Sequence, residues 1–292
     1  MAIGVLEVVE LVLVGLAAGV LGGLLGIGGS VVMLPALVIL FSGRDWGGQH
    51  LWQASAMLVN VVIAVPAARK HAKKGAFRRG MFVRVLPATG VMIVVGVLVS
   101  EGLDGSQLQQ VLGVFLGYVC VMMVWKVVRG LPDHEESASR VTWLRGSVVG
   151  GVMGFMAGLL GIGGAVIATP MMQVLCRAPL RNAIAVSAAV MCLTSPVGAG
   201  LKVWGVTSHG HAWWEPWAIF GLLAPAAIVG SHFGASVSHR LPLDRLRLVF
   251  SVVLGIAAVR LFVGGMEVGG ADGGGGGGVA AVSSGAGGAP GR

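Results

Sequence analysis

The chain has 292 residues, of which 55% are hydrophobic and only 11% are charged, and its mean hydropathy is +0.88. Such a composition cannot cover one core with polar surface, which excludes an ordinary water-soluble globular protein. The net charge of +8 does not indicate a nucleic-acid-binding protein, because the basic residues lie in short loops without interleaved aromatic residues. We predict an all-α, polytopic integral membrane protein.

The chain begins with an apolar run, residues 4–41, that is too long for one membrane span. As a single helix it would reach about 57 Å, nearly twice the hydrocarbon thickness. The stretch GLLGIGGS at residues 23–30 predicts where it folds back, because glycine is a poor helix former. Pro35 fits the first turns of a helix that restarts after Gly29.

Three further apolar spans complete a first repeat, which we assign to residues 1–130. They are expected at about 52–68, 80–100 and 108–128. A strongly basic loop follows the first of them and a short acidic loop follows the second. Residues 131–143 form a polar connection that we place in the cytoplasm.

The glycine stretch recurs as GLLGIGGA at residues 158–165, again followed by a proline, Pro170. Residues 144–264 therefore form a second repeat of the same plan, with a broken hairpin at 144–176 and spans at about 183–202, 214–237 and 245–264. The glycine-rich tail, residues 265–292, has too few large apolar residues to order itself, and we expect it to be disordered.

Lysine and arginine counts indicate how the two repeats lie in the membrane. If each hairpin returns to the side it entered from, the loops on one side hold fifteen of these residues and the loops on the other side hold two. If the halves were parallel, the split would be eleven to six. Positive residues favour the cytoplasmic side, so we predict two inverted repeats about an axis in the membrane plane, with both termini outside.

The paired glycine stretches, their downstream prolines and the serines at Ser55 and Ser187 resemble the TauE/SafE family, the sulfite exporter family of bacterial membrane proteins. The resemblance spans residues 4 to about 264. It implies transport of small sulfur-containing anions, such as sulfite, sulfoacetate or other organosulfonates, outward across the bacterial inner membrane. The chain departs from the family pattern after Ser187, where two alanines follow, and in its tail.

Each helix break also predicts an anion site, because free backbone N–H groups at a helix start carry partial positive charge. We expect the two breaks to meet near the membrane midplane around a small anion. The alternative is that the glycines serve close helix packing. The predicted substrate-binding residues are Gly26, Ile27, Gly28, Gly29 and Ser30 in the first break, Gly161, Ile162, Gly163, Gly164 and Ala165 in the second, and the polar residues Ser55, Asn60, Ser187, Thr194 and Ser195.

Two ionisable residues are candidates for proton coupling or anion attraction. His232 lies in an apolar stretch and could accept a proton, although a structural role near the basic inner loop is the alternative. Lys202 lies near the outer end of a span, where its long stem is expected to reach the interface and could draw in an anion.

Other functions lack their motifs. The glycine stretches are not followed by Lys-Ser/Thr, so they are not phosphate-binding loops, and no span carries a paired nucleophile and base, so we predict no enzyme. Midplane carboxylates for a cation carrier are missing, and we expect no metal, no cofactor and no nucleic acid. The expected partners are a small anion and the lipid bilayer, and the chain could form homo-oligomers. An anion channel, or an uptake permease for another small oxyanion, is the alternative function.

Overall fold

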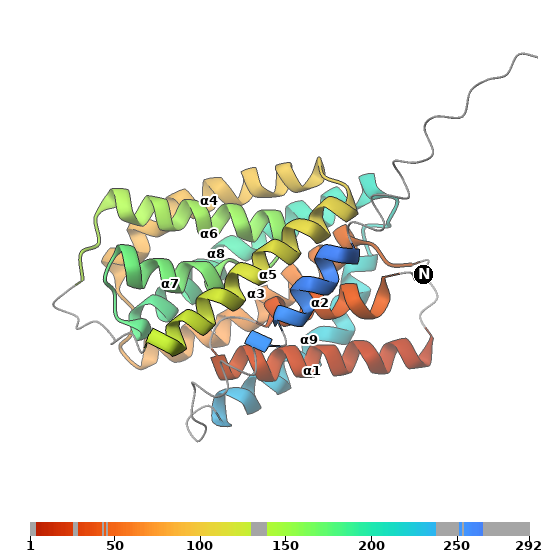
Figure 1. The fold of residues 1–292 in the computed structure, drawn as a ribbon, viewed down its shortest axis with the longest axis horizontal. Helices are drawn as coiled ribbons and strands as arrows, with labels where there is room; N and C mark the ends of the chain where they lie inside the picture. The colour runs from red at the N-terminus through yellow and green to blue at the C-terminus, as the bar shows by residue number, and fades with distance from the viewer. Residues whose placement is uncertain are drawn as a thin grey trace, which may run out of the picture.

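The computed structural model describes residues 4–25, 29–42, 44, 46–129, 139–237, 251–252 and 254–264. These residues form a bundle of helices without strands, and seven of the helices are long and apolar enough to cross a membrane (Figure 1). The predicted class, an all-α polytopic membrane protein, is confirmed. The predicted tail and most of the connection at 131–143 lie outside the described residues.

The helices follow the chain in this order: α1 (Val5–Leu25), α2 (Ser30–Phe41), α3 (Gln49–Lys73), α4 (Arg79–Glu101), α5 (Gly105–Arg129), α6 (Trp143–Leu160), α7 (Ala165–Leu175), α8 (Leu180–Gly205), the 3₁₀ helix η2 (Val206–His209) and α9 (Glu215–Val237). A last short helix, Leu254–Gly264, carries no label. The helices α2 and α7 are short, with 12 and 11 residues, and each follows one of the glycine breaks.

The first hairpin consists of α1 and α2, and its two arms lie side by side. A Cβ atom on Gly29 would be 2.8 Å from the carbonyl oxygen of Ala18, which places the start of α2 against α1. At the open end of the hairpin, Nη1 of Arg44 lies 3.4 Å from Oε1 of Glu7. The chain therefore returns to the end of the bundle from which α1 started.

The second hairpin, α6 and α7, is closed in a similar way. The Arg140 N–H donates to the Cys176 carbonyl at 2.8 Å, so the segment before α6 meets the end of α7. Thr142 caps α6 by accepting a hydrogen bond from the Arg145 N–H at 3.3 Å. The first hairpin leads into the start of α3 and the second into the start of α8.

The helices α3 and α8 cross the centre of the bundle in opposite directions. Gln53 contacts Lys202 at one level, while Met57 contacts Gly198 at the next, so residue numbers rise along one helix and fall along the other. We call the end of the bundle where α3 begins and α4 and α8 end the Glu101 end. The two hairpins open toward opposite ends, which is the geometry that inverted repeats require; the repeat boundaries stay a prediction.

Glycines bring two further helix pairs into close contact. Along α1, Gly15, Gly19 and Gly23 face the backbone of α9, and a Cβ on Gly19 would overlap the Ala227 carbonyl. Along α6, Gly158 likewise faces the Ile93 carbonyl of α4. Small residues spaced by four allow membrane helices to approach closely. Gly23 and Gly158, the first residue of each stretch, thus pack as the alternative expects, and Gly29 and Gly164 also lie against backbone carbonyls, at Ala18 and Met153.

Candidate functional site

The two glycine breaks meet in the centre of the bundle. Oγ of Ser30, the first residue of α2, donates to the carbonyl oxygen of Ile162 in the second break at 2.8 Å. Both residues are buried. The structure therefore brings the described end of the first break, at Ser30, against the second break, at Ile162. The predicted site residues Gly26, Ile27 and Gly28 lie outside the described residues.

The second break has a backbone that only glycine adopts without strain. Gly161, Gly163 and Gly164 have φ values of 73°, 75° and 69°, in the left-handed region. A Cβ atom on Gly163 would also lie 2.6 Å from Cε of Met191 and 3.1 Å from Nδ2 of Asn60. Both conformation and space therefore require glycine at this position.

The break leaves backbone donors at the start of α7. The first backbone hydrogen bond into this helix is donated by Ala168 to the Gly164 carbonyl at 3.1 Å. The N–H groups of Ala165, Val166 and Ile167 make no backbone hydrogen bond to any residue that the structure describes. They lie at the positive end of the helix dipole and are buried. This is the arrangement that favours an anion at a helix start.

Two amide side chains of α3 face the second break. Nδ2 of Asn60 lies 3.5 Å from the Gly161 carbonyl oxygen, at the limit of a hydrogen bond. Gln53 lies two helical turns earlier on the same face, and its Cβ would be 3.1 Å from a Cβ on Gly161. The buried Nε2 of Gln53 has no hydrogen-bond partner among the described residues. Sequence reasoning missed Gln53, although an amide two turns before Asn60 in an apolar span was the available signal.

Of the other predicted polar residues, two bond to their own helices and two are buried on α8. The hydroxyl groups of Ser55 and Thr194 donate to carbonyls of their own helices, at Leu51 and Val190. Ser187 and Ser195 are buried on α8. Within the part of the chain that the structure describes, Oγ of Ser187 has no hydrogen-bond partner. Of the side chains predicted to bind substrate, Ser30 and Asn60 are the ones for which the described part of the chain shows a hydrogen bond to the second break.

The interfacial position predicted for Lys202 is wrong. Its side chain is 1% exposed, and Nζ donates to Oε1 of Gln53 at 2.6 Å and to Oγ of Ser100. Nζ also lies 3.7 Å from Oε1 of Glu101. A carboxylate and two neutral acceptors replace water around the ammonium group, so it stays inside the bundle. Gln53 consequently links the second break to the charged residues at the Glu101 end.

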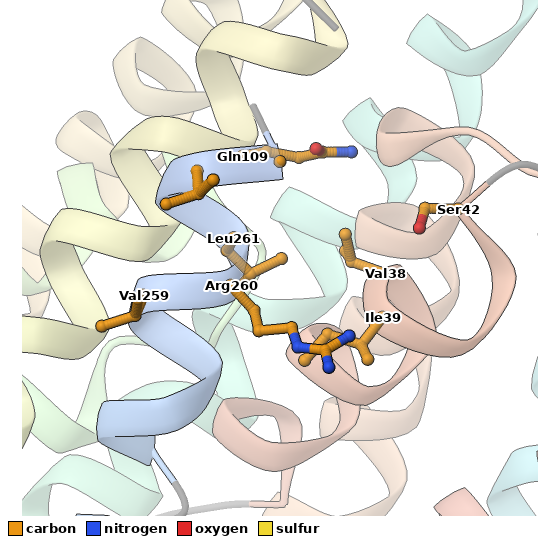
Figure 2. A pocket seen from close by; sticks show the side chains of 9 residues that line it. Val38, Ile39, Ser42, Gln109, Val259, Arg260 and Leu261 are labelled. Atoms are coloured by element: carbon orange, nitrogen blue, oxygen red, sulfur yellow. The ribbon is translucent and has the colours of Figure 1, made fainter. Parts of the chain in front are cut away.

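His232, the other ionisable candidate, lies at an exposed position on α9, whereas the described residues of the two breaks are buried. A role for it in proton coupling stays a prediction. A cavity of about 400 Å³ lies elsewhere, between α2, α5 and the last helix (Figure 2). Its lining includes Ser42, Gln109 and Arg260 but none of the predicted substrate-binding residues.

The comparison with known families decides the class of protein. Residues 11–261, most of the chain, match the family described as Sulfite exporter TauE/SafE. The chain belongs to this family. The resemblance carried by the paired glycine stretches is thereby confirmed, and the chain is a multi-pass membrane protein of the TauE/SafE family.

Relatives of the chain carry transporter names. The chain is 26% identical to "Probable membrane transporter protein MamO" of Paramagnetospirillum magneticum, over 88% of this chain and 45% of that protein, so it spans about half the length of MamO. It is 24% identical to "Probable membrane transporter protein YunE" of Bacillus subtilis, over 88% of this chain and 98% of YunE. A "Probable membrane transporter protein" of Haemophilus influenzae is 24% identical, over 86% of this chain and 96% of that protein. No solved structure matches the chain.

Proposed function

We propose that this TauE/SafE transporter is a secondary carrier that moves small sulfur-containing anions, such as sulfite, sulfoacetate or other organosulfonates, outward across the bacterial inner membrane. The anion would bind between the two glycine breaks. The observation that supports this most directly is the hydrogen bond from Ser30 to Ile162, which brings the starts of two short helices from different halves of the chain together. The family description, a sulfite exporter, supports the proposed substrate class.

The donors around the second break suit an oxyanion. The N–H groups of residues 165–167 lie at the start of α7, and the side-chain amides of Gln53 and Asn60 come from α3. An oxyanion has several acceptor oxygens, so it can accept from backbone and side-chain donors together. Irregular backbone at membrane depth is tolerated only where protein buries it or a wet cavity adjoins it.

The described break residues are buried, so a substrate can reach them only if the bundle opens. The hairpins open toward opposite ends of the bundle and meet at their tips. Movement of one hairpin away from α3 and α8 would expose the site to one end, and movement of the other would expose it to the opposite end. This is alternating access around a fixed central site.

A vesicle assay tests the proposal. The purified chain is reconstituted, and flux of sulfite, thiosulfate, sulfate, sulfoacetate and taurine is measured with and without a proton gradient. A carrier gives flux that saturates with one or more sulfur-containing anions, whereas a channel gives flux that does not saturate. Saturable flux of a different oxyanion alone would favour the alternative permease.

A glycine pair provides the matched variants for this assay. Gly163→Ala places a methyl group 2.6 Å from Met191 in a strained conformation, whereas Gly200→Ala on α8 meets open space. We expect Gly163→Ala to reduce flux at least about tenfold, because a misplaced binding group costs that much or more. Gly200→Ala should transport normally. Equal flux in the two variants, at equal amounts of protein in the vesicles, would contradict the proposed site.

A further inference from the structure

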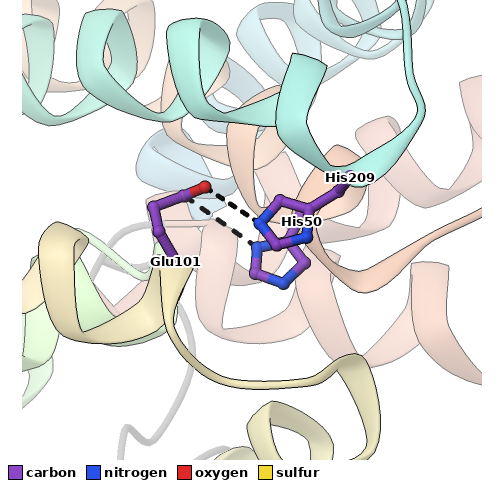
Figure 3. A group of neighbouring side chains, drawn as sticks. All are labelled: His50, Glu101 and His209. Atoms are coloured by element: carbon purple, nitrogen blue, oxygen red, sulfur yellow. Dashed lines mark hydrogen bonds and ion pairs between the residues drawn. The ribbon is translucent and has the colours of Figure 1, made fainter.

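Three potential metal ligands converge at the Glu101 end of the bundle, apart from the glycine breaks (Figure 3). His50 is the second residue of α3, Glu101 is the last residue of α4, and His209 is the last residue of η2. Three elements that are distant in the sequence therefore direct their side chains to one place. The sequence did not indicate this site, because the three residues are far apart along the chain and mid-membrane carboxylates are missing.

The distances among the three groups suit a small cation. Nδ1 of His50 lies 3.9 Å from Oε1 of Glu101, and Nε2 of His209 lies 3.0 Å from Oε2 of the same carboxylate. All three ligand atoms lie within 4.8 Å of one another. Zinc binds nitrogen and oxygen at about 2.0–2.2 Å in tetrahedral geometry, which separates its ligands by about 3.3–3.6 Å. The observed separations, 3.0 and 3.9 Å, lie on both sides of that range.

Two of the ligand atoms lack a hydrogen-bond partner among the described residues. For one of them, Nδ1 of His50, a neighbouring carbonyl holds the other nitrogen of the ring. His50 is 6% exposed, and its Nε2 lies 3.1 Å from the Leu103 carbonyl oxygen. A carbonyl can only accept, so Nε2 carries the proton, and in the neutral ring Nδ1 then has the lone pair that can bind a metal beside Glu101. Neither this Nδ1 nor Oε1 of Glu101 has a hydrogen-bond partner among the described residues. Metal-binding histidines are held by the same kind of contact on their other nitrogen.

The surroundings leave room for the carboxylate and allow His209 to adjust. Gly205 faces Glu101, and a Cβ there would overlap the carboxylate. The rings of His50 and His209 are stacked, with centroids 3.5 Å apart and planes at 8°. Parallel rings direct their lone pairs side by side, so His209 must tilt to share a metal with His50. It can do so because it is 25% exposed and ends a four-residue 3₁₀ helix.

Lys202 competes with a metal for the same carboxylate. Its Nζ lies 3.7 Å from Oε1 of Glu101, and two positive groups on one carboxylate oxygen repel each other. Lys202 also has neutral acceptors in Gln53 and Ser100, which it can keep when Glu101 turns toward the metal. A bound metal would therefore weaken the ion pair of Lys202 without leaving its ammonium group unpaired.

We propose that His50, Glu101 and His209 bind a divalent transition metal ion of the zinc class, as two imidazoles and one carboxylate, with a fourth position open to water. This site is separate from the proposed anion site and does not depend on it. Binding would change the charge next to Lys202, whose partner Gln53 adjoins the second break. A bound metal would thus change the electrostatic surroundings of residues at the centre of the bundle.

Cobalt titration of the full chain, purified in detergent without a polyhistidine tag, tests the proposal. Four-coordinate Co²⁺ bound by nitrogen and oxygen absorbs visible light far more strongly than hydrated Co²⁺. We expect this absorption to saturate at one Co²⁺ per chain and to disappear when Zn²⁺ is added. Loss of a residue that only hydrogen-bonds to a metal ligand weakens metal binding about tenfold or more. Glu101→Gln and His209→Ala each remove a ligand, so each should weaken Co²⁺ binding by more than about tenfold.

His211→Ala is the matched control. His211 pairs with Glu215 through Nδ1 at 2.9 Å and lies outside the three-residue cluster, so its variant should bind Co²⁺ like the unchanged chain. His209 is partly exposed, so His209→Ala keeps the test open if Glu101→Gln does not fold. The proposal is overturned if the unchanged chain shows no saturable absorption. It is also overturned if folded His209→Ala binds Co²⁺ as tightly as the control.

Discussion

Nζ of Lys202 donates a hydrogen bond to Oε1 of Gln53 at 2.6 Å, deep between α8 and α3. This contact joins two features of the bundle. On one side Gln53 lies against Gly161 in the second break, and on the other side Lys202 lies 3.7 Å from Glu101. A buried ammonium group is expensive unless it is paired, so the chain must retain its partners to fold as it does.

Lys202→Met should destabilise the protein by about 2 kcal/mol, because it leaves the Glu101 carboxylate without its cation and Gln53 without its donor. The double variant Lys202→Met, Glu101→Gln should lose less than the sum of the two single variants, since neither charge is then left unpaired. Thermal unfolding in detergent, or denaturant titration, measures the difference. Additive losses would show that the two charges do not interact.

Asn60→Leu should raise the substrate concentration at half-maximal flux about tenfold, because it removes an amide donor beside Gly161 and Gly163. Ser55→Ala is the control on the same helix. Its hydroxyl bonds to the Leu51 carbonyl of its own helix, so we expect flux close to that of the unchanged chain. Concentration series of flux in vesicles separate the two. Equal effects of both variants would remove Asn60 from the proposed site.

The helices were predictable from local sequence because apolar runs end at charged or glycine-containing segments. The span expected at about 80–100 coincides with α4, Arg79–Glu101, and the break expected within residues 23–30 separates α1 from α2. Glycine explains both the break and the close approach of helices, since it lacks the Cβ that would prevent either. Element type and approximate position therefore follow from composition along the chain.

Contacts between distant elements were not predictable in the same way. Lys202 looks interfacial in the sequence because it is near a helix end, but Glu101 of α4 reaches it there. His50, Glu101 and His209 come from three elements, and each alone resembles an ordinary residue at a helix end. Their convergence depends on how α3, α4 and α8 pack, which no local pattern encodes.

Gly19→Ala should destabilise the protein by about 1–3 kcal/mol, because a methyl group there would overlap the Ala227 carbonyl and push α1 away from α9. Gly90→Ala on α4 is the matched control, since a methyl group there meets open space and alanine favours the helix. Thermal unfolding of the two variants in the same detergent compares them. If Gly19→Ala unfolds at the same temperature as Gly90→Ala, then α1 and α9 do not pack as closely as described.

The inverted arrangement predicts where reporters fused to the chain will lie. The loop at 74–78, between α3 and α4, carries Lys74 and Arg78 and should be cytoplasmic, whereas the turn at 102–104, at the Glu101 end, should be outside. Since the last helix ends at Gly264, a reporter fused there should also lie outside if the second half is inverted relative to the first. Paired reporters, one active only in the cytoplasm and one only outside it, measure this. A reporter at Gly264 that is active in the cytoplasm, with the 74–78 loop also cytoplasmic, would show that the halves are parallel.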